Sequence, residues 1–389
     1  MTPKFIQIHT LTSWAGVLLN RDESGMGKRL PYGGAVRGRV SSQCKKRHWR
    51  MADDPRSISA LGEEIGGSGV RSREIVEYRI MEPLSGRFPD DVVKAICDGI
   101  VERLYGKSGV DKISSRQALL LGQAEVDWLA GEAEALAAAS PDLAAAKDAV
   151  ETWLKDQSKN LSRLQAVTAM PSGLDAALFG RMVTSDRAAN MDASVMVNHS
   201  ITVHAEQSEL DYFSVVDDLS PNAAGVFDAE INSGLYYGYV VIDVAQLVAN
   251  TTGMPVSEWN GEVDRDVAAR AAENLVHLIS KVTPGAKKGS TAPFSRASLM
   301  LVEIGDGQPT TLDGAFLEPL PVTDRSGVSI GRRAADALSR RIADFDAMYG
   351  EESVRRQASL EEFALSDVER ASVPALADWV AEAIRSAAA

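Results

Sequence analysis

The sequence predicts an α+β fold whose strands and helices follow the order β–α–β–β–α–β, interrupted by two long insertions. Short apolar runs rich in β-branched and aromatic residues recur along the chain, at residues 4–11, 193–204, 235–244 and 296–304. Amphipathic helical patterns follow the first and the third of these runs. The insertions come after the first helix and after the second strand. Without them the order is ferredoxin-like, which is also the topology of RNA-recognition sheets.

The first fifty residues contain the first strand, a loop and a strand that leads into a helix. KFIQIHTL is an apolar, β-rich run, whereas residues 16–34 are rich in glycine and charge, have no period and indicate a loop. The following residues alternate, which places Arg37, Arg39 and Ser41 on one face of a strand. Ser41 or Ser42 can cap the helix that SQCKKRHWRMA predicts.

The rest of the chain holds the insertions and the remaining elements. Residues 53–180 show mostly amphipathic, Ala-rich helical patterns and form the first insertion. Residues 205–234 are acidic and turn-rich and form the second. The pattern of residues 262–282 predicts an amphipathic helix, and a flexible basic loop, 283–294, follows it. The tail from about residue 331 is predicted to be helical.

Composition bounds the function. The chain has 389 residues and a net charge of −13, which argues against a nucleic-acid partner for the surface as a whole. Residues 20–50, however, carry nine Lys or Arg and two Asp or Glu. The two cysteines, Cys44 and Cys97, form no CxxC pair, so we expect a cytoplasmic protein without a disulfide framework. Neither a signal peptide nor a membrane-spanning run is expected.

The basic cluster in RGRVSSQCKKRHWR is the strongest functional signal. Lys46 and Arg50 are four residues apart and share a helix face, while Ser42 and Gln43 lie at the first helical turn. The strand arginines and the positive helix N-terminus point to the same region, and residues 35–50 contain no acid. A solvated basic helix is the alternative, but such a helix usually mixes both signs. The cluster therefore predicts a site for a bent phosphodiester backbone.

Other positions leave alternatives open. Arg21 and Lys28, and Lys287 and Lys288 in PGAKKGST, are surface charges or further contacts, and PGAKKGST lacks the P-loop spacing. Met182, which follows Arg181, is either a buried core residue or an exposed one. The pair Tyr212–Phe213 forms a local core or stacks between bases. Adjacent Asp217 and Asp218 are solvated or bind a cation; His199 and His204 point to opposite strand faces and predict no metal site. No catalytic motif is found.

Taken together and in order, several segments resemble one family. They are FIQIHTL, LNRDESG, RGRVSSQCKKRHWR, GLDAALFGRMVTSD, VNHSITVH, DYFSVVDDL, SGLYYGYVVIDVAQL and TPGAKK. The set is similar to the CasC-type backbone subunit of the type I-E CRISPR Cascade complex, of the RAMP superfamily.

The resemblance implies a hand-shaped protein with an RRM-like palm, helical fingers and a projecting thumb loop or hairpin. The parts would be palm at 1–52, fingers at 53–180, palm at 181–204, thumb at 205–234, palm at 235–330 and a C-terminal helical segment at 331–389. Such subunits assemble head-to-tail along a CRISPR guide RNA, contact other Cascade subunits and present the guide for pairing with target DNA in antiviral defence. The resemblance also implies no catalysis, cofactor, metal or membrane contact. A metal-dependent ribonuclease of the same fold, using Asp217 and Asp218, is the alternative.

The resemblance and the cluster together give the expected RNA contacts. They are Arg21, Lys28, Arg39, Ser41, Ser42, Gln43, Lys46, Arg50, Arg181, Met182, Tyr212, Phe213, Lys287 and Lys288. The remaining cations of the cluster, Arg37, Lys45 and Arg47, are expected to face a neighbouring subunit or solvent.

Overall fold

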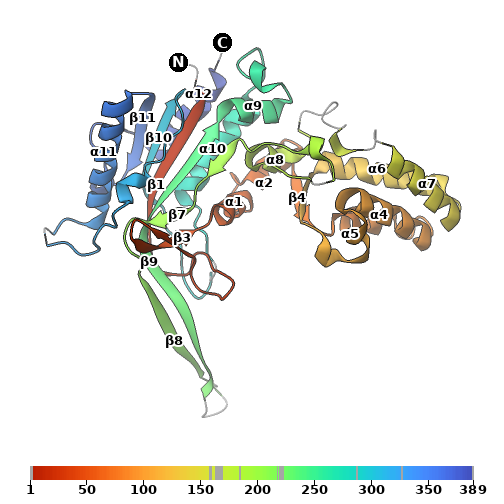
Figure 1. Ribbon diagram of the computed structural model, residues 1–389, viewed down its shortest axis with the longest axis horizontal. Coiled ribbons are helices and arrows are strands. Elements are labelled where there is room, and N and C mark those ends of the chain that lie inside the picture. The colour runs from red at the N-terminus through yellow and green to blue at the C-terminus, as the bar shows by residue number, and fades with distance from the viewer. Residues whose placement is uncertain are drawn as a thin grey trace. The chain divides into compact units, whose positions relative to one another are not determined.

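A computed structural model of the chain describes residues 3–156, 160–162, 170–183, 185–216, 218, 223–285, 288–325 and 327–387 (Figure 1). The chain divides into two compact units. The first unit contains Met1–Ser57, Val195–Val244 and Ala269–Ala389, and the second contains Ile58–Ser194 and Ala245–Ala268.

The first unit is built on a mixed sheet whose strand order is β12-β11-β10-β1-β9-β7-β3-β2. Short β6 and hairpin strand β8 also pair with β9, and every pairing is antiparallel except β11 with β12. The strands are β1 (Phe5–Val17), β2 (Arg29–Tyr32), β3 (Ala35–Val40), β6 (Val195–Val197), β7 (Ser200–Thr202), β8 (Ser208–Val216), β9 (Ala223–Asp243), β10 (Ala297–Gly305), β11 (Ser353–Ser359) and β12 (Glu369–Arg370). Central β1 lies between β9 and β10, with Leu11 opposite both Tyr237 and Leu299.

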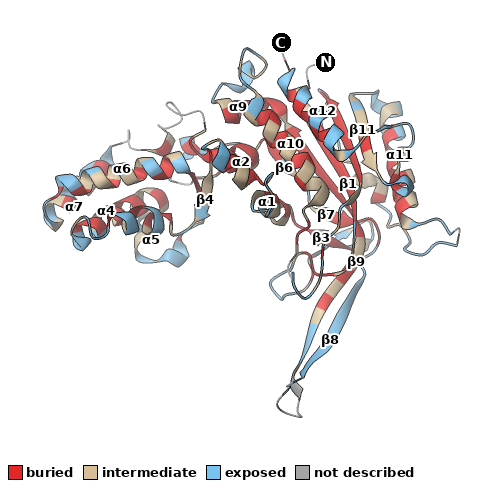
Figure 2. Ribbon diagram, turned by 180° about the vertical axis from the view of Figure 1, so that it is seen from behind, coloured by how far each residue is buried: buried red, intermediate tan, exposed pale blue. Residues whose placement is uncertain are grey.

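Helices cover both faces of this sheet, because successive side chains of a strand point to opposite sides. Leu11, Tyr237 and Leu301 pack on one face against Ala334 and Leu338 of α11 (Ile330–Tyr349). The other face carries α1 (Ser42–Arg50), α10 (Asp266–Lys281) and α12 (Val373–Arg385), as Figures 1 and 2 show. Single turns η7 (Asp313–Phe316) and η8 (Glu361–Phe363) complete the unit.

Strands β8 and β9 continue past the sheet as a long hairpin (Figure 1). Its outer part is exposed, as the pale blue of Figure 2 shows, yet it carries several large apolar side chains. Phe213 lies opposite Phe227 with a ring-centroid distance of 5.8 Å, and Tyr212 is 72% exposed. The turn-rich stretch predicted at 205–234 therefore contains a hairpin, and β9 runs on without a break into the sheet.

The second unit is mainly helical and has its own core. Its longer helices are α4 (Asp90–Tyr105), α6 (Gln123–Ala139) and α7 (Leu143–Lys155), which pack through buried residues such as Ile96, Ile100 and Leu129. The unit also holds α2 (Ile58–Glu64), β4 (Gly69–Ser72), η1 (Glu77–Met81), α3 (Glu82–Leu84), α5 (Lys107–Asp111), η2 (Ile113–Ser115), β5 (Leu119–Gly122), α8 (Gly173–Phe179), η5 (Arg187–Ala189), most of α9 (Val244–Thr252) and η6 (Val256–Glu258).

The predicted α+β class is confirmed, with three local differences. Strand β2 lies in the predicted loop 16–34, and β4 pairs with β5 within the predicted helical insertion. The tail predicted to be only helical also contributes β11 and β12 to the sheet. Each of these strands is short or rich in polar residues, so its pairing depends on a distant partner that a local pattern does not contain. In the described residues, no helix combines the length and apolar character needed to cross a membrane.

Candidate nucleic-acid interface

Helix α1 begins directly after strand β3, and its first turn is set by side chains around it. Ser41 caps the helix, because its hydroxyl accepts a hydrogen bond from the Cys44 backbone N–H at 3.3 Å. The Ser42 backbone N–H donates to His199 Nδ1 at 2.9 Å, and the Ser41 N–H donates to Asn20 Oδ1 at 2.9 Å. The first turn contains no acidic residue, so the positive end of the helix is not neutralised locally.

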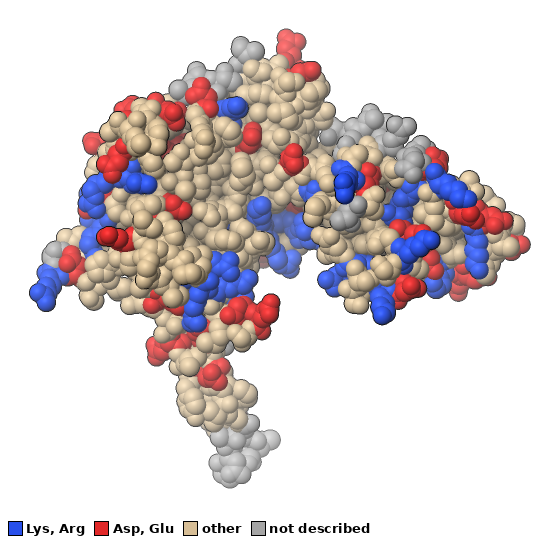
Figure 3. All heavy atoms as spheres, viewed as in Figure 1, with Lys and Arg blue, Asp and Glu red and all other residues tan. Residues whose placement is uncertain are grey.

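Several cations surround this helix start. Arg39 on β3 is half-buried, and its Nε has no hydrogen-bond partner among the described residues. Burial lowers the pKa of His199, and the charges of Arg39, Lys45 and Lys28 lower it further, so these cations lie close to one imidazole. Figure 3 shows Lys and Arg side chains gathered over α1 and beside β2. The arrangement can hold an anion.

The loop before β2 carries Arg21 and Lys28 and is ordered by its own hydrogen bonds. The Asp22 carboxylate accepts from the Ser24 and Met26 backbone N–H groups at 2.9 and 3.0 Å. The Lys28 carbonyl accepts from the Arg39 N–H at 2.8 Å, which links the loop to β3. Arg21 is exposed, Lys28 is half-buried, and both line an open hollow. The two predicted contacts therefore lie on a fixed loop.

Arg37 does not face a neighbour or solvent, which corrects the prediction. Its side chain is fully buried, and its guanidinium donates to the carbonyls of Thr202 at 2.8 Å and Phe316 at 2.7 Å. Burial lowers the pKa of Arg37. Alternation along the strand predicts that the arginine face points outward, but the residues around Phe316 cover it at Arg37. Arg37 therefore ties β3 to a distant segment of the chain.

Lys45 is also buried, which corrects its assignment to a surface. Its ammonium donates to Ser200 Oγ at 2.9 Å and lies 5.8 Å from the Trp49 ring centroid. Burial lowers its pKa to about 7. It borders an internal cavity of about 30 Å³ between α1, α10 and the sheet. Because α1 packs on the sheet through this side, Lys45 is not available to a ligand, whereas Lys46 and Arg50 are half-buried and Arg47 is exposed.

The two predicted contacts in the second unit, Arg181 and Met182, differ in burial. Arg181 is buried, and its guanidinium pairs with the Glu125 carboxylate within 2.8 Å. The Glu125 side chain is fully buried, and Arg181 also donates to the Ala189 carbonyl at 2.7 Å. The guanidinium is thus enclosed in the core, which corrects the prediction that Arg181 contacts RNA directly. Met182 is 62% exposed and stays a candidate contact.

The remaining predicted residues are exposed or half-buried, or fall outside the described residues. Lys288 and Asp218 are exposed, whereas Lys287 and Asp217 lie outside the described residues. In the described part of the chain, no three His, Cys, Asp or Glu side chains gather as a metal site would require. On α1, Gln43 is exposed and Ser42 is half-buried.

Sequence reasoning missed two features of this surface. His199 was weighed only as a metal ligand, yet it accepts the first backbone N–H of α1. At the base of the hairpin, Arg29 pairs with Glu206 and Glu230, and Glu230 also accepts the Gly27 N–H at 2.6 Å. The partners are up to about two hundred residues apart, so no local signal could have found them.

Similar proteins agree with this architecture. A chain of a solved structure described as a "CRISPR RNA-guided surveillance complex, pre-nicking" is 24% identical with a TM-score of 0.73; the match covers 98% of this chain and 100% of that chain. A chain of a second, a "CRISPR RNA-guided surveillance complex", is 23% identical with a TM-score of 0.68, and the match covers 97% and 99%. At these identities the likeness establishes the fold. No curated protein matches the chain. The Cas family model described as "CT1975-like protein" matches residues 6–382, and the chain therefore belongs to the CT1975-like family.

Proposed function

We propose that this chain is a non-catalytic backbone subunit of a CRISPR RNA-guided complex, of the CasC type found in type I-E Cascade. It binds the guide RNA, assembles head-to-tail with further copies in the cytoplasm and presents the guide for pairing with target DNA. Membership of the CT1975-like family and a fold shared with chains of CRISPR RNA-guided surveillance complexes support the proposal. The observation that carries it is the basic surface around the start of α1.

The α1 surface suits several phosphates of one bent strand. The N-terminal turn offers backbone N–H groups and the positive end of the helix dipole, with Ser42 and Gln43 beside it. Arg39 approaches from β3, and Lys46 and Arg50 follow along the helix at i and i+4. Contacts of this kind position a nucleic-acid backbone without reading its sequence, which suits a subunit that must accept any guide.

Two further features support the finer assignment. The neighbour order β10–β1–β9–β7, with α1 after β1 and α10 after β9, matches the order expected of a ferredoxin-like, RRM-like palm and supports that part of the proposal. The β8–β9 hairpin carries exposed Tyr212 and Phe213, and aromatic rings on such a thumb stack on bases for about 1–3 kcal/mol each. The acidic body favours head-to-tail packing, since a negative face of one copy can meet the basic face of the next.

The salt dependence of guide binding tests the site. For single-stranded RNA, the logarithm of the affinity falls with the logarithm of the salt concentration by about 0.7 per neutralised phosphate. We expect Lys46→Ala with Arg50→Ala to weaken binding and to reduce this slope by about 1.4. Arg47→Ala, on the same helix, is the matched control and should change the slope less. An unchanged affinity and slope in the double variant would contradict the assignment.

Incubation of the RNA-bound complex with complementary RNA and Mg²⁺ tests the absence of catalysis. We expect the RNA to remain intact. Periodic cleavage that Asp217→Asn abolishes would replace this proposal with the metal-dependent ribonuclease.

A further inference from the structure

A pocket of about 380 Å³ lies on the face of the sheet that carries α11, opposite the α1 surface. Its walls come from the start of β1, the end of β10, the loop after β10, the C-terminal end of α11 and the start of β11. Phe5, Ile342, Phe345 and Tyr349 supply apolar and aromatic walls. A pocket of this size and mixed lining is typical of ligand sites.

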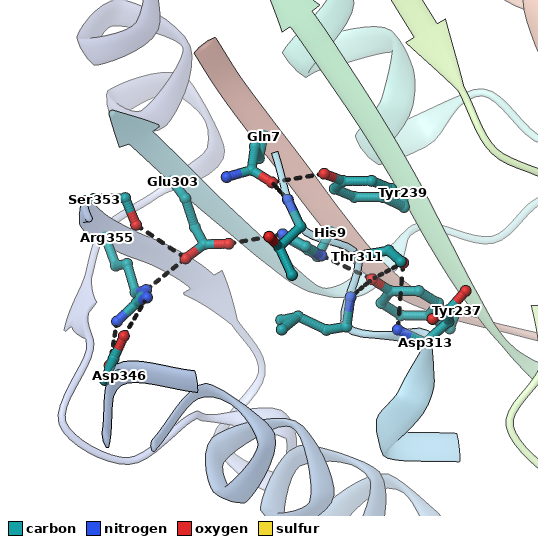
Figure 4. Close-up of polar contacts among 12 residues, drawn as sticks. Gln7, His9, Tyr237, Tyr239, Glu303, Thr311, Asp313, Asp346, Ser353 and Arg355 are labelled. Atoms are coloured by element: carbon teal, nitrogen blue, oxygen red, sulfur yellow. Dashed lines mark hydrogen bonds and ion pairs between the residues drawn. The ribbon is translucent and has the colours of Figure 1, made fainter. Parts of the chain in front are cut away.

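The floor of the pocket is held rigid by the buried polar network of Figure 4. Fully buried His9 bonds Glu303 at 2.9 Å and the Tyr237 hydroxyl at 2.8 Å. Arg355 pairs with Glu303 and donates hydrogen bonds to both carboxylate oxygens of Asp346, at 2.6 and 2.8 Å. These partners, against the opposing effect of burial, hold the pKa of Glu303 down to about 2, so the carboxylate is charged at every physiological pH.

On this floor the Gln7 amide nitrogen makes no hydrogen bond to protein within the described residues, and it is open to the pocket. Gln7 is 9% exposed, and its Oε1 accepts from the Tyr239 hydroxyl at 2.6 Å and from the Thr310 backbone N–H at 2.7 Å. A backbone N–H can only donate, so the orientation of the amide is fixed. Its NH₂ group therefore faces the pocket, and Figure 4 shows this nitrogen directed away from Tyr239. An oxygen acceptor on a ligand would take the place of solvent at this donor.

The pocket also carries an excess of negative charge. Three carboxylates, Glu303, Asp346 and Glu352, line it against the single guanidinium of Arg355. The Glu352 carboxylate lies against Gly307, where a side chain on the glycine would collide with it. The last turn of twenty-residue α11 contains no basic residue, so the negative end of its dipole is not compensated there. Lys4 and Arg341 lie over the Phe5 and Phe345 rings, but neither lines the pocket.

We propose that this pocket binds a segment of a partner protein that carries a lysine or arginine side chain. The basic side chain lies between the aromatic walls and pairs with Glu352, while a main-chain carbonyl of the segment accepts the Gln7 NH₂ donor. A polyamine could satisfy the charge but has no acceptor for Gln7. The proposal does not rest on RNA binding by α1, and the two sites can be tested separately.

Blocked arginine (N-acetyl-arginine methylamide) is a minimal probe, because it carries both the cation and main-chain carbonyls. Agmatine keeps the guanidinium and lacks the carbonyls, and blocked leucine keeps the carbonyls and lacks the charge. In titrations of the full chain followed by NMR, we expect blocked arginine to bind several-fold more tightly than agmatine, spermidine or blocked leucine. Equal affinity for agmatine or spermidine would overturn the assignment to a protein segment.

A pair of neighbouring variants locates the site. Glu352→Gln should weaken binding of blocked arginine five- to tenfold, and Glu351→Gln, which changes the same charge outside the pocket lining, should weaken it less than twofold. Both glutamates are exposed, so neither substitution threatens folding. Equal effects of the two variants, or no binding of blocked arginine to the wild type, would refute the proposal, whatever the result for RNA.

Discussion

The pH dependence of stability is a direct test of the buried position of Lys45. Its pKa is about 7 in the folded protein, against a normal value of 10.5. Between these values the unfolded chain holds the proton and the folded chain does not. The free energy of unfolding therefore gains a contribution that rises with pH, by at most about 1.4 kcal/mol per unit. Below pH 7 Lys45 is charged in both states, and folding carries the full cost of burying the ammonium.

Replacement by methionine removes this contribution while it preserves most of the packing against Trp49. Lys45→Met also removes the hydrogen bond to Ser200, at a cost of about 1 kcal/mol at every pH. We expect the variant to be the more stable protein at pH 6, and its advantage to shrink by up to about 3 kcal/mol between pH 7 and 9.

Urea unfolding of the RNA-free chain at a series of pH values measures this difference. All other titrating groups are common to both proteins, so they cancel in the comparison. Lys46→Met is the control, because Lys46 lies on the same helix but is only half-buried, and its curve should run parallel to that of the wild type. A parallel curve for Lys45→Met as well would refute the reasoning, since it would mean that the ammonium is solvated.

Two other predictions concern stability. Arg181→Met leaves Glu125 as an unpaired buried charge and should lower the free energy of unfolding, measured with urea, by about 3–5 kcal/mol. Adding Glu125→Leu should recover most of this loss. Equal losses in the single and double variants would contradict the buried pair. Gly33→Ala would place a Cβ 1.4 Å from the Leu317 carbonyl oxygen. It should lower the melting temperature well beyond the effect of Gly34→Ala, because Gly34 has a similar positive φ but open space around it. Equal effects of the two variants would mean that only backbone conformation matters.

Local patterns predicted those parts of the fold that they specify by themselves. The run of buried residues in β1, the amphipathic α10 and the capped start of α1 all have signals within about ten residues. The strands at or next to the sheet edges do not, because β2, β11 and β12 are short or carry many charges and form only against partners supplied by the rest of the sheet.

The candidate site shows the same division. The spacing of Lys46 and Arg50 is a property of one helix and could be predicted. The burial of Arg37 and Lys45 could not, because it depends on Phe316 and Ser200, which lie far away in the sequence. A charged residue in a basic run is usually exposed, and only the tertiary partners identify the two that are not.

The β8–β9 hairpin has a consequence for handling the protein. In the described part of the chain β8 pairs only with β9, so its outer edge offers unsatisfied backbone groups beside exposed Phe213 and Val216. Such an edge is a template for aggregation unless something covers it or charges protect it. Acidic Glu209 and Asp211 interrupt the apolar run on β8 and oppose this pairing. We therefore expect the chain to precipitate when purified alone at low net charge, near its pI of about 5.0, and to stay dispersed at higher pH.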